Sequence, residues 1–216
     1  MRKTLIAALV LTAIPAAAVI GAQQAPMRAP GIKDVRRVSG GTYTVDPNHT
    51  LVRWTVDHLG FTPYFGLFGS ATGTLTLDPK NPRAASVDIT IPVAKVTTAS
   101  AGLTSHLLRS GKDGGKPDFF GAAPDDARFI STSVTVRGTT AKVAGSLKLN
   151  GYTKPVVLDV TFYGAGTSPA MGGYPAKENV GFEATTTIRR SEFGIATGIP
   201  MVSDQVELNI VAAFTK

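Results

Sequence analysis

The chain has 216 residues, of which 43% are hydrophobic and 17% are charged, and 23 of them are glycines. Its apolar share is that of an ordinary globular protein, and its length suits one large β domain or one domain with an extension. The absence of cysteine excludes disulfide scaffolds, thiolate zinc sites, iron–sulfur clusters and cysteine nucleophiles. The net charge of +7 is scattered and forms no basic helical stripe, so we expect no nucleic-acid partner.

The first 22 residues are predicted to be a secretory signal peptide. A positive start at residues 2–3 is followed by an uncharged apolar stretch over residues 4–14, and then by a proline and small residues. This order is typical of a cleaved leader, and cleavage is expected after Ala22 or, alternatively, after Ala18. The uncharged stretch is also long enough for an uncleaved anchor, which stays the alternative. We expect a mature protein in the periplasm without stable membrane insertion.

Residues 23–40 are rich in Ala, Pro, Gly and Arg and are predicted to be a flexible lead-in. Residues 41–216 then alternate between apolar and polar positions, which is typical of half-buried strands. In the first long alternation, residues 50–58, one face carries Val52, Trp54, Val56 and His58. We therefore expect Trp54 and His58 to face the interior, where both are candidate ligand contacts.

A second alternation, over residues 66–78, is predicted to be one strand bent by its interior glycines. One of its faces carries Leu67, Gly69, Ala71, Gly73, Leu75 and Leu77. From this face, Leu67 and Leu75 are candidate ligand contacts in the interior of the fold.

The remaining chain repeats the same strand pattern and contains one helical stretch. Further strand candidates are residues 42–46, 85–91, 130–136, 141–149, 156–162, 182–188 and 206–214. Residues 100–110 look helical, with Leu103 and Leu107 four apart and Thr98 or Ser100 as the N-cap. No strand–helix–strand alternation is present, which argues against a parallel α/β fold.

These elements predict an all-β fold, namely an antiparallel, roughly eight-stranded, lipocalin-like β-barrel with one short helix. A barrel of that size has an interior that holds side chains or one slender ligand.

The three histidines are the candidates for a metal site or for acid–base chemistry. His49 and His58 lie at the two ends of one predicted strand, about 30 Å apart if it is straight, so shared ligation is not expected. The chain also lacks the Gly-x-Ser-x-Gly motif of serine hydrolases. We predict no catalytic residue, no metal and no cofactor. His58 is either a satisfied, partly buried histidine or a contact for the head of a ligand.

Aromatic side chains gather after the first long strand and after the helix. They are Phe61, Tyr64, Phe65 and Phe68, followed later by Phe119 and Phe120. Such a group is either part of the core or the lined mouth of a pocket beside a barrel end. The second interpretation makes Phe61, Phe65, Leu107, Phe119 and Phe120 ligand contacts.

A series of short motifs runs from residue 42 to residue 214. It includes Tyr43-x-Val45-Asp46-x-x-His49-Thr50, Val56-x-His58-x-Gly60-Phe61, Gly73-Thr74-Leu75-x-Leu77-Asp78, Asp118-Phe119-Phe120, Gly145-x-Leu147-x-Leu149-x-Gly151 and Ile188-x-Arg190-Ser191-x-Phe193-Gly194. In this order the motifs resemble the signature of the YceI-like polyisoprenoid-binding proteins. The resemblance implies an exported bacterial lipocalin-like barrel that holds an isoprenoid, quinone-like or other long-chain amphiphile in an apolar cavity. It implies no catalytic residue, because none is established for the family.

The sequence departs from the family pattern at three places near the helix. Thr104-Ser105 stand where Arg-Asp is usual, residues 111–117 form an insertion, and Gly121 stands where an acidic residue is common. These departures affect the expected head-group preference rather than the expected fold.

We therefore predict an exported protein that binds a long-chain amphiphile (polyisoprenoid, isoprenoid quinone or fatty-acid-like lipid) for carriage, storage or sequestration. One isoprene unit contributes about 4 kcal/mol at most. Association costs on the order of 4–15 kcal/mol, so long tails are expected to bind and short ones are not. Two alternatives stay open: an enzyme acting on an isoprenoid lipid with His58 or His106 as the acid–base, and a ligand-free structural or stress protein. A homodimer also stays open.

Overall fold

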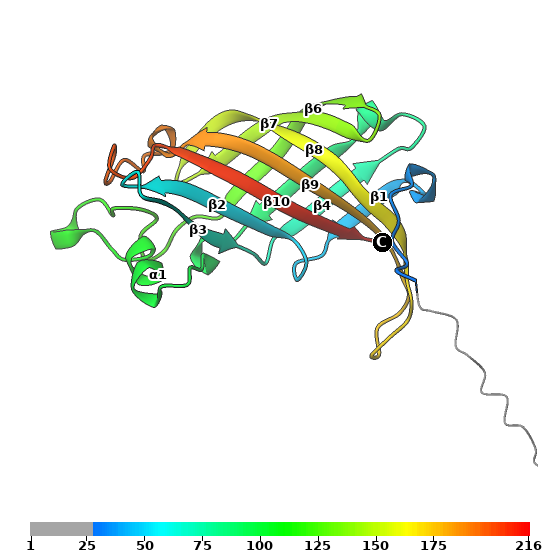
Figure 1. Cartoon of the computed structure of the whole chain (residues 1–216), viewed down its shortest axis with the longest axis horizontal. Helices are drawn as coiled ribbons and strands as arrows, with labels where there is room; N and C mark the ends of the chain where they lie inside the picture. Colours follow the sequence, from blue (N-terminus) through cyan, green and yellow to red (C-terminus); the bar gives the residue numbers. More distant parts are fainter. Residues whose placement is uncertain (1–27) are drawn as a thin grey trace, which may run out of the picture.

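Ten strands form one antiparallel sheet in the computed structural model, which describes residues 28–216 (Figure 1). The strands are β1 (Gly41–Val45), β2 (Leu51–His58), β3 (Thr62–Phe68), β4 (Thr72–Leu77), β5 (Ser86–Ile91), β6 (Ala127–Arg137), β7 (Thr140–Leu149), β8 (Tyr152–Ser168), β9 (Lys177–Arg189) and β10 (Gln205–Thr215). The helical elements are α1 (Ala101–Leu107) and the 3-10 turns η1 (Val35–Arg37), η2 (Pro82–Ala84), η3 (Val93–Lys95), η4 (Lys112–Gly114) and η5 (Arg190–Phe193). The predicted signal peptide, residues 1–22, lies outside the described residues.

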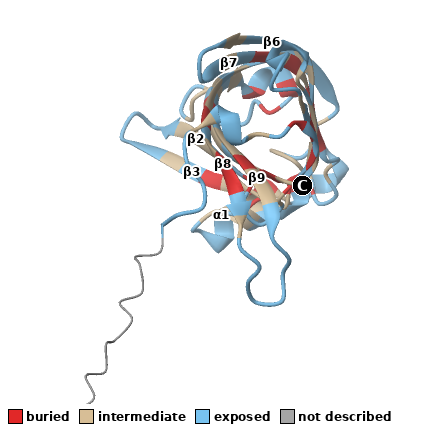
Figure 2. Cartoon of the chain, turned by 90° about the vertical axis from the view of Figure 1, so that its right-hand side faces the viewer, coloured by how far each residue is buried: buried red, intermediate tan, exposed pale blue. Residues whose placement is uncertain are grey.

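The sheet closes into a barrel through β10. One edge of β10 pairs with β9, while its other edge pairs first with β2 and then, at Phe214 and Thr215, with β1. Because β1 also pairs with β4, strands β1 and β4 to β10 complete a ring of eight, with buried residues on its inner wall (Figure 2). The predicted fold class, an antiparallel, roughly eight-stranded barrel with one short helix, is confirmed.

Strand β10 passes from β2 to β1 at the corner between these two strands, and its backbone groups at Ala213 stay hydrogen-bonded there. The Asp46 N–H donates to the Ala213 carbonyl over 2.8 Å. The Thr50 hydroxyl donates to the same carbonyl and accepts from the Ala213 N–H, both at 3.1 Å. Thr50 therefore substitutes for a strand neighbour at the bend.

The strand predicted over residues 66–78 is in fact two strands, which is a correction to the sequence analysis. β3 ends at Phe68, and β4 begins at Thr72 after a break in which Ser70 has a φ of +55°. The alternation of inner and outer side chains restarts after this break. Leu67 consequently faces outward opposite Arg53, whereas Leu75 faces inward opposite the fully buried Tyr43.

One end of the barrel is filled by an apolar cluster. Its buried members are Tyr43, Val45, Ala71, Leu75, Phe162, Ala165, Val180 and Phe214. The Phe182 ring packs edge-to-face on both Phe162 and Phe214, with ring centroids 5.8 and 6.2 Å apart. This cluster occupies the interior at the end of the barrel near the C-terminus, and none of its buried members belongs to the cavity wall described below.

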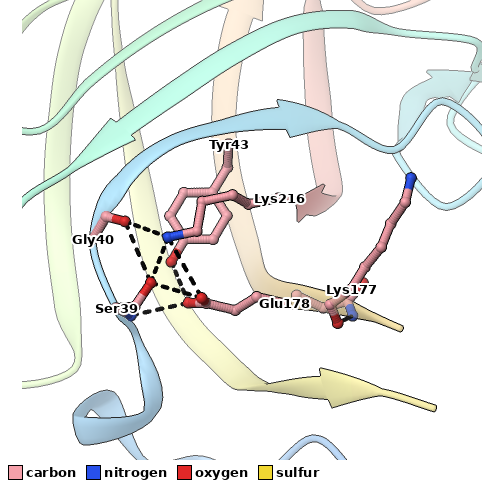
Figure 3. A network of polar contacts seen from close by, with 7 residues as sticks. Ser39, Gly40, Tyr43, Lys177, Glu178 and Lys216 are labelled. Carbon is pink, nitrogen blue, oxygen red and sulfur yellow. Dashed lines mark hydrogen bonds and ion pairs between the residues drawn. The ribbon is translucent and has the colours of Figure 1, made fainter. Parts of the chain in front are cut away.

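A polar network closes the same end (Figure 3). The Glu178 carboxylate accepts hydrogen bonds from the Ser39 N–H at 2.9 Å, from the Ser39 hydroxyl at 2.6 Å and from the Tyr43 hydroxyl. The Lys216 ammonium donates to Ser39 and Gly40 and lies 3.5 Å from the same carboxylate. Burial raises the pKa of Glu178, but the hydrogen bonds from Ser39 and Tyr43 and the charge of Lys216 outweigh it and lower that pKa to about 2.

The described part of the predicted lead-in lies against β8. The Ile32 N–H donates to the Ala165 carbonyl over 3.1 Å, and the Ala165 N–H donates back over 3.0 Å. Gly166 permits this approach, because a Cβ at that position would lie 2.2 Å from the Pro30 carbonyl oxygen.

At the end of the barrel away from the C-terminus, the long connection between β5 and β6 carries α1 (Figure 1). Ser100 caps this helix by accepting a hydrogen bond from the Leu103 N–H at 3.2 Å. The short helix and its cap at Ser100 are confirmed.

Candidate binding cavity

A cavity of about 490 Å³ lies at the α1 end of the barrel. It is bounded by β2 and β3, by α1, by the segment at residues 118–120 that we call the strap, and by the loop at residues 195–203 that we call the rim loop. His58 and Thr197 line the cavity and are solvent-exposed, so the cavity opens to solvent at this end.

The strand alternation of β2 builds one side of the cavity. Val52, Trp54, Val56 and His58 all line it. On the neighbouring β10, Leu208 is paired with Trp54 and also lines the cavity. Because cross-strand partners share a face, two adjacent strands with apolar inner positions produce a continuous apolar wall.

Trp54 lies over Gly66, its partner on β3. A Cβ at Gly66 would be only 2.3 Å from Trp54 Cζ2, so the glycine provides the space that the indole occupies. The Tyr64 ring lies beside the indole, with centroids 6.5 Å apart. Trp54 Nε1 is buried and has no hydrogen-bond partner among the described residues. This nitrogen is covered by protein atoms, so the indole faces the cavity with its carbon surface.

The strap packs two phenylalanine rings against the cavity. The Phe120 N–H donates to the Leu107 carbonyl over 3.1 Å, which fixes the strap to the end of α1. The Phe120 ring packs edge-to-face on Phe68 of β3, and the Phe119 ring packs edge-to-face on His106, with centroids 5.9 and 5.1 Å apart. The strap therefore bridges α1 and β3 beside the opening.

Asp118 ties the start of the strap to α1. Its Oδ2 atom lies 2.8 Å from His106 Nε2 and 2.7 Å from Arg109 Nη2. The hydrogen bond from Arg109, followed by that with His106, holds the pKa of Asp118 below its usual value. His106 is thus engaged by a carboxylate on one ring edge while it lines the cavity.

Arg190 holds the rim loop in place. Its side chain is buried and lines the cavity. The guanidinium donates to the main-chain carbonyls of Ile195, Thr197, Val202 and Ser203 at 2.8–3.2 Å. Burial lowers the pKa of Arg190, and the nearby Asp204 carboxylate partly opposes this effect. One buried side chain thereby organises both ends of the loop.

Within residues 28–216, no group of three or more His, Cys, Asp or Glu side chains is arranged to hold a metal ion. His49 lies 2.7 Å from Asp46 in the β1–β2 corner, far along the strand from His58. In the same part of the chain, no helix has the length and apolarity needed to cross a bilayer.

Sequence and structure comparisons identify the relatives of this barrel. The model of the YceI-like domain matches residues 43–214. The chain belongs to the YceI-like domain family. A UPF0312 protein of Pseudomonas aeruginosa is 37% identical over 169 residues, which cover 77% of this chain and 82% of that protein.

Two solved structures show the same fold. A Campylobacter jejuni YceI protein is 28% identical, with a TM-score of 0.57 over 74% of this chain and 89% of its own. A polyisoprenoid-binding domain from Saccharophagus degradans has a TM-score of 0.52 and 12% identity over 80% of this chain and 97% of its own. At that identity the second likeness shows the fold alone.

In this YceI-like barrel, five of the predicted ligand contacts lie in the cavity wall. They are Trp54, His58, Leu107, Phe119 and Phe120.

The other four predicted contacts, Phe61, Phe65, Leu67 and Leu75, lie outside the cavity wall. Phe65 is paired with Thr55 and Leu67 with Arg53, which are the outward positions of β2. Phe61 lies in the β2–β3 turn and is exposed, and Leu75 belongs to the apolar cluster at the other end. The strand break at Ser70 and the hairpin register explain these positions.

Several wall residues are not among the predicted ligand contacts, although Tyr64 and Phe68 belong to the aromatic group found in the sequence. Tyr64 and Phe68 of β3 line the cavity because they are paired with Val56 and Val52, the inner positions of β2. The short turn between β2 and β3 fixes which residues of the two strands are paired, so it could have indicated that Tyr64 and Phe68 face inward. Arg190 and the rim loop had no such signal, because their contacts with the cavity depend on long-range closure of the barrel.

The three departures from the family pattern all have local structural consequences. Thr104 accepts a hydrogen bond from the Thr98 N–H at 3.0 Å, so its side chain supports the start of α1. The insertion at residues 111–117 bulges outward between Arg109 and Asp118, and none of its residues lines the cavity. Gly121 has a φ of +82°, and a Cβ there would lie 3.2 Å from Pro117 of the insertion. The insertion and the glycine are therefore structurally linked.

Proposed function

We propose that this protein binds one long-chain amphiphile, with the tail in the cavity, and carries, stores or sequesters it in the periplasm. The observation that supports the proposal is the lining of the cavity. Its wall consists almost entirely of aliphatic and aromatic side chains, while His58, His106 and Arg190 supply polar groups next to the opening. Such a wall favours an apolar tail through the release of water, with the head group toward the opening.

The cavity volume sets the expected length of the bound tail. A carbon group of the tail is taken to occupy about as much space as one water molecule in the liquid, so 490 Å³ holds about 16 carbon atoms, or about three isoprene units. Each of those units contributes at most about 4 kcal/mol from burial. A longer polyisoprenoid would extend through the opening, and its outer units would add little affinity.

The polyisoprenoid-binding domain that shares this fold supports an isoprenoid as the tail. The predicted signal peptide at residues 1–22 supports export, since its charged, apolar and small-residue regions follow the order of a cleaved leader.

Mass spectrometry of protein purified from the periplasmic fraction tests both parts of the proposal. The denatured mass is expected to correspond to a chain that begins between residues 19 and 23, and the native mass is expected to exceed it by one lipid. A full-length chain in the membrane fraction would contradict cleavage of the signal peptide and favour the uncleaved anchor. A native mass equal to that of the bare polypeptide, unchanged after incubation with long-chain prenols, would favour the ligand-free structural alternative.

A further inference from the structure

Beside the opening of the cavity, three apolar side chains project into solvent. They are Leu59 and Phe61 in the β2–β3 turn and Met201 in the rim loop, and we call them the apolar tip. Phe61 is 84% exposed and Met201 is 61% exposed. Large apolar side chains grouped at a functional opening mark an interaction surface more often than scattered ones do.

The turn that carries the apolar tip is held by hydrogen bonds. The Leu59 N–H donates to the Met201 carbonyl over 2.7 Å, which joins the two segments side by side. The Gly60 N–H donates to the Asp57 carboxylate over 2.7 Å, and the Ser203 N–H donates to the Asp57 carbonyl over 3.0 Å. The exposure of Phe61 is therefore imposed by the backbone around it.

The segments that carry the apolar tip contain no Asp, Glu, Lys or Arg. The uncharged stretches are residues 58–77 and residues 193–203. Because burying an unpaired charge is costly, segments without charges enter an apolar medium far more easily than charged ones. The exposed Asp57 carboxylate borders the tip, where it accepts the hydrogen bond from the Gly60 N–H. The composition of the two segments matches the acyl boundary of a bilayer, with the single carboxylate of Asp57 at the edge of the tip.

The apolar tip is continuous with the cavity wall. His58 and Val202 line the cavity, are paired with each other across the two segments, and directly adjoin Leu59 and Met201 in the chain. Long-chain lipids reside in bilayers, and their transfer through water exposes the whole tail. An opening whose edge enters the bilayer surface would avoid that exposure.

We propose that the apolar tip inserts into the surface of a lipid bilayer and places the cavity opening against it, so that the ligand passes between membrane and barrel. This inference rests on the proposed function, because it assumes that the cargo is a membrane lipid. A few apolar side chains that project from a protein surface lie at the headgroup–acyl boundary rather than spanning the membrane.

Co-sedimentation with phosphatidylcholine vesicles tests the proposal, using wild type and the double variant Phe61→Ser/Met201→Ser. The matched control is Met171→Ser/Tyr174→Ser. Those two side chains are 75% and 76% exposed, and they lie in the β8–β9 connection at the other end of the barrel. We expect the tip variant to bind vesicles at least about tenfold more weakly, because two apolar side chains no longer leave water, and the control to bind like wild type.

Equal vesicle binding by wild type and the tip variant would overturn the proposal, as would an equal loss in the control. Binding that requires added phosphatidylglycerol and is independent of the tip would also overturn it, in favour of charge-driven docking. Circular dichroism checks that both variants are folded.

A titration of each variant with a three-unit prenol, without vesicles and followed by Trp54 fluorescence, separates the two proposals. We expect the tip variant to bind the prenol like wild type, because neither substituted residue lines the cavity. If the prenol binds none of the proteins while the tip variant still loses vesicle binding, the proposed function fails and the docking surface stands.

Discussion

Single residues decide how much of the barrel interior is open. Trp54 occupies the space that a side chain at position 66 would need. Arg190 lines the cavity, and its guanidinium holds the rim loop through hydrogen bonds to main-chain carbonyls. Of these two residues, only Trp54 had a position inside the barrel that could be predicted from the sequence. The period of β2 puts Trp54 inside, whereas the four carbonyl partners of Arg190 come from a loop without periodicity.

The substitution Gly66→Ala tests the packing of the indole. The new Cβ would lie 2.3 Å from Trp54 Cζ2 and 2.7 Å from the Thr97 carbonyl oxygen, so the indole must move. We expect a loss of about 1–3 kcal/mol in the free energy of unfolding, measured with urea, and a shift of the Trp54 emission. Gly181→Ala on β9 is the control, because its Cβ would meet neighbours only at 3.8 Å or more. Equal stability of the two variants would contradict the close packing of Trp54 on Gly66.

Among the secondary-structure elements, strands were predicted correctly where apolar and polar residues alternate without a break. The prediction was wrong where this alternation is interrupted. The inner face of β2 and the single helix were correct, and the chain between residues 66 and 78 was not. There, the break around Ser70 exchanges the inner and outer faces for odd-numbered residues. Leu67 before the break therefore faces outward, and Leu75 after it faces inward. A one-residue change of phase moves every following side chain to the other face, so an unrecognised break misplaces all of them.

The polar network joins β1, β9, the segment before β1 and the C-terminal Lys216, and it gives a pH-dependent contribution to stability. Glu178 has its pKa lowered from 4.5 to about 2, so the network stabilises the fold fully above about pH 4.5 and loses this contribution as the pH falls toward 2. We expect Glu178→Gln to lower the free energy of unfolding at pH 7 by about 1–3 kcal/mol, with a difference from wild type that shrinks below about pH 4.5.

Urea unfolding of wild type and Glu178→Gln between pH 7 and pH 3 measures this difference. Glu183→Gln, an exposed position on the same strand, is the control and is expected to follow wild type. A stability difference for Glu178→Gln that stays constant over the whole pH range would contradict the assignment of the contribution to the ionised carboxylate.

The whole molecule divides its interior into a filled end and an open end. The cluster around Tyr43 and Leu75, closed by the Glu178 network, fills the end near the C-terminus, and the cavity occupies the end under α1. The sequence predicted a barrel and an apolar interior, but it could not predict this division. Which inner side chains meet across the barrel depends on how β10 closes the sheet onto β1 and β2.

The central claim is that burial of an apolar tail in the cavity drives binding. A titration with prenols of increasing length, followed by Trp54 fluorescence, tests it most directly on wild type, Phe120→Ala and Phe65→Ala. Affinity is expected to rise with each unit up to about three units and then level off, since the cavity holds about 16 carbon atoms. Phe120→Ala is expected to weaken binding of the longer prenols by roughly 1–3 kcal/mol, and Phe65→Ala, outside the cavity, to leave it unchanged. An affinity independent of tail length, or an equal loss in both variants, would contradict the claim.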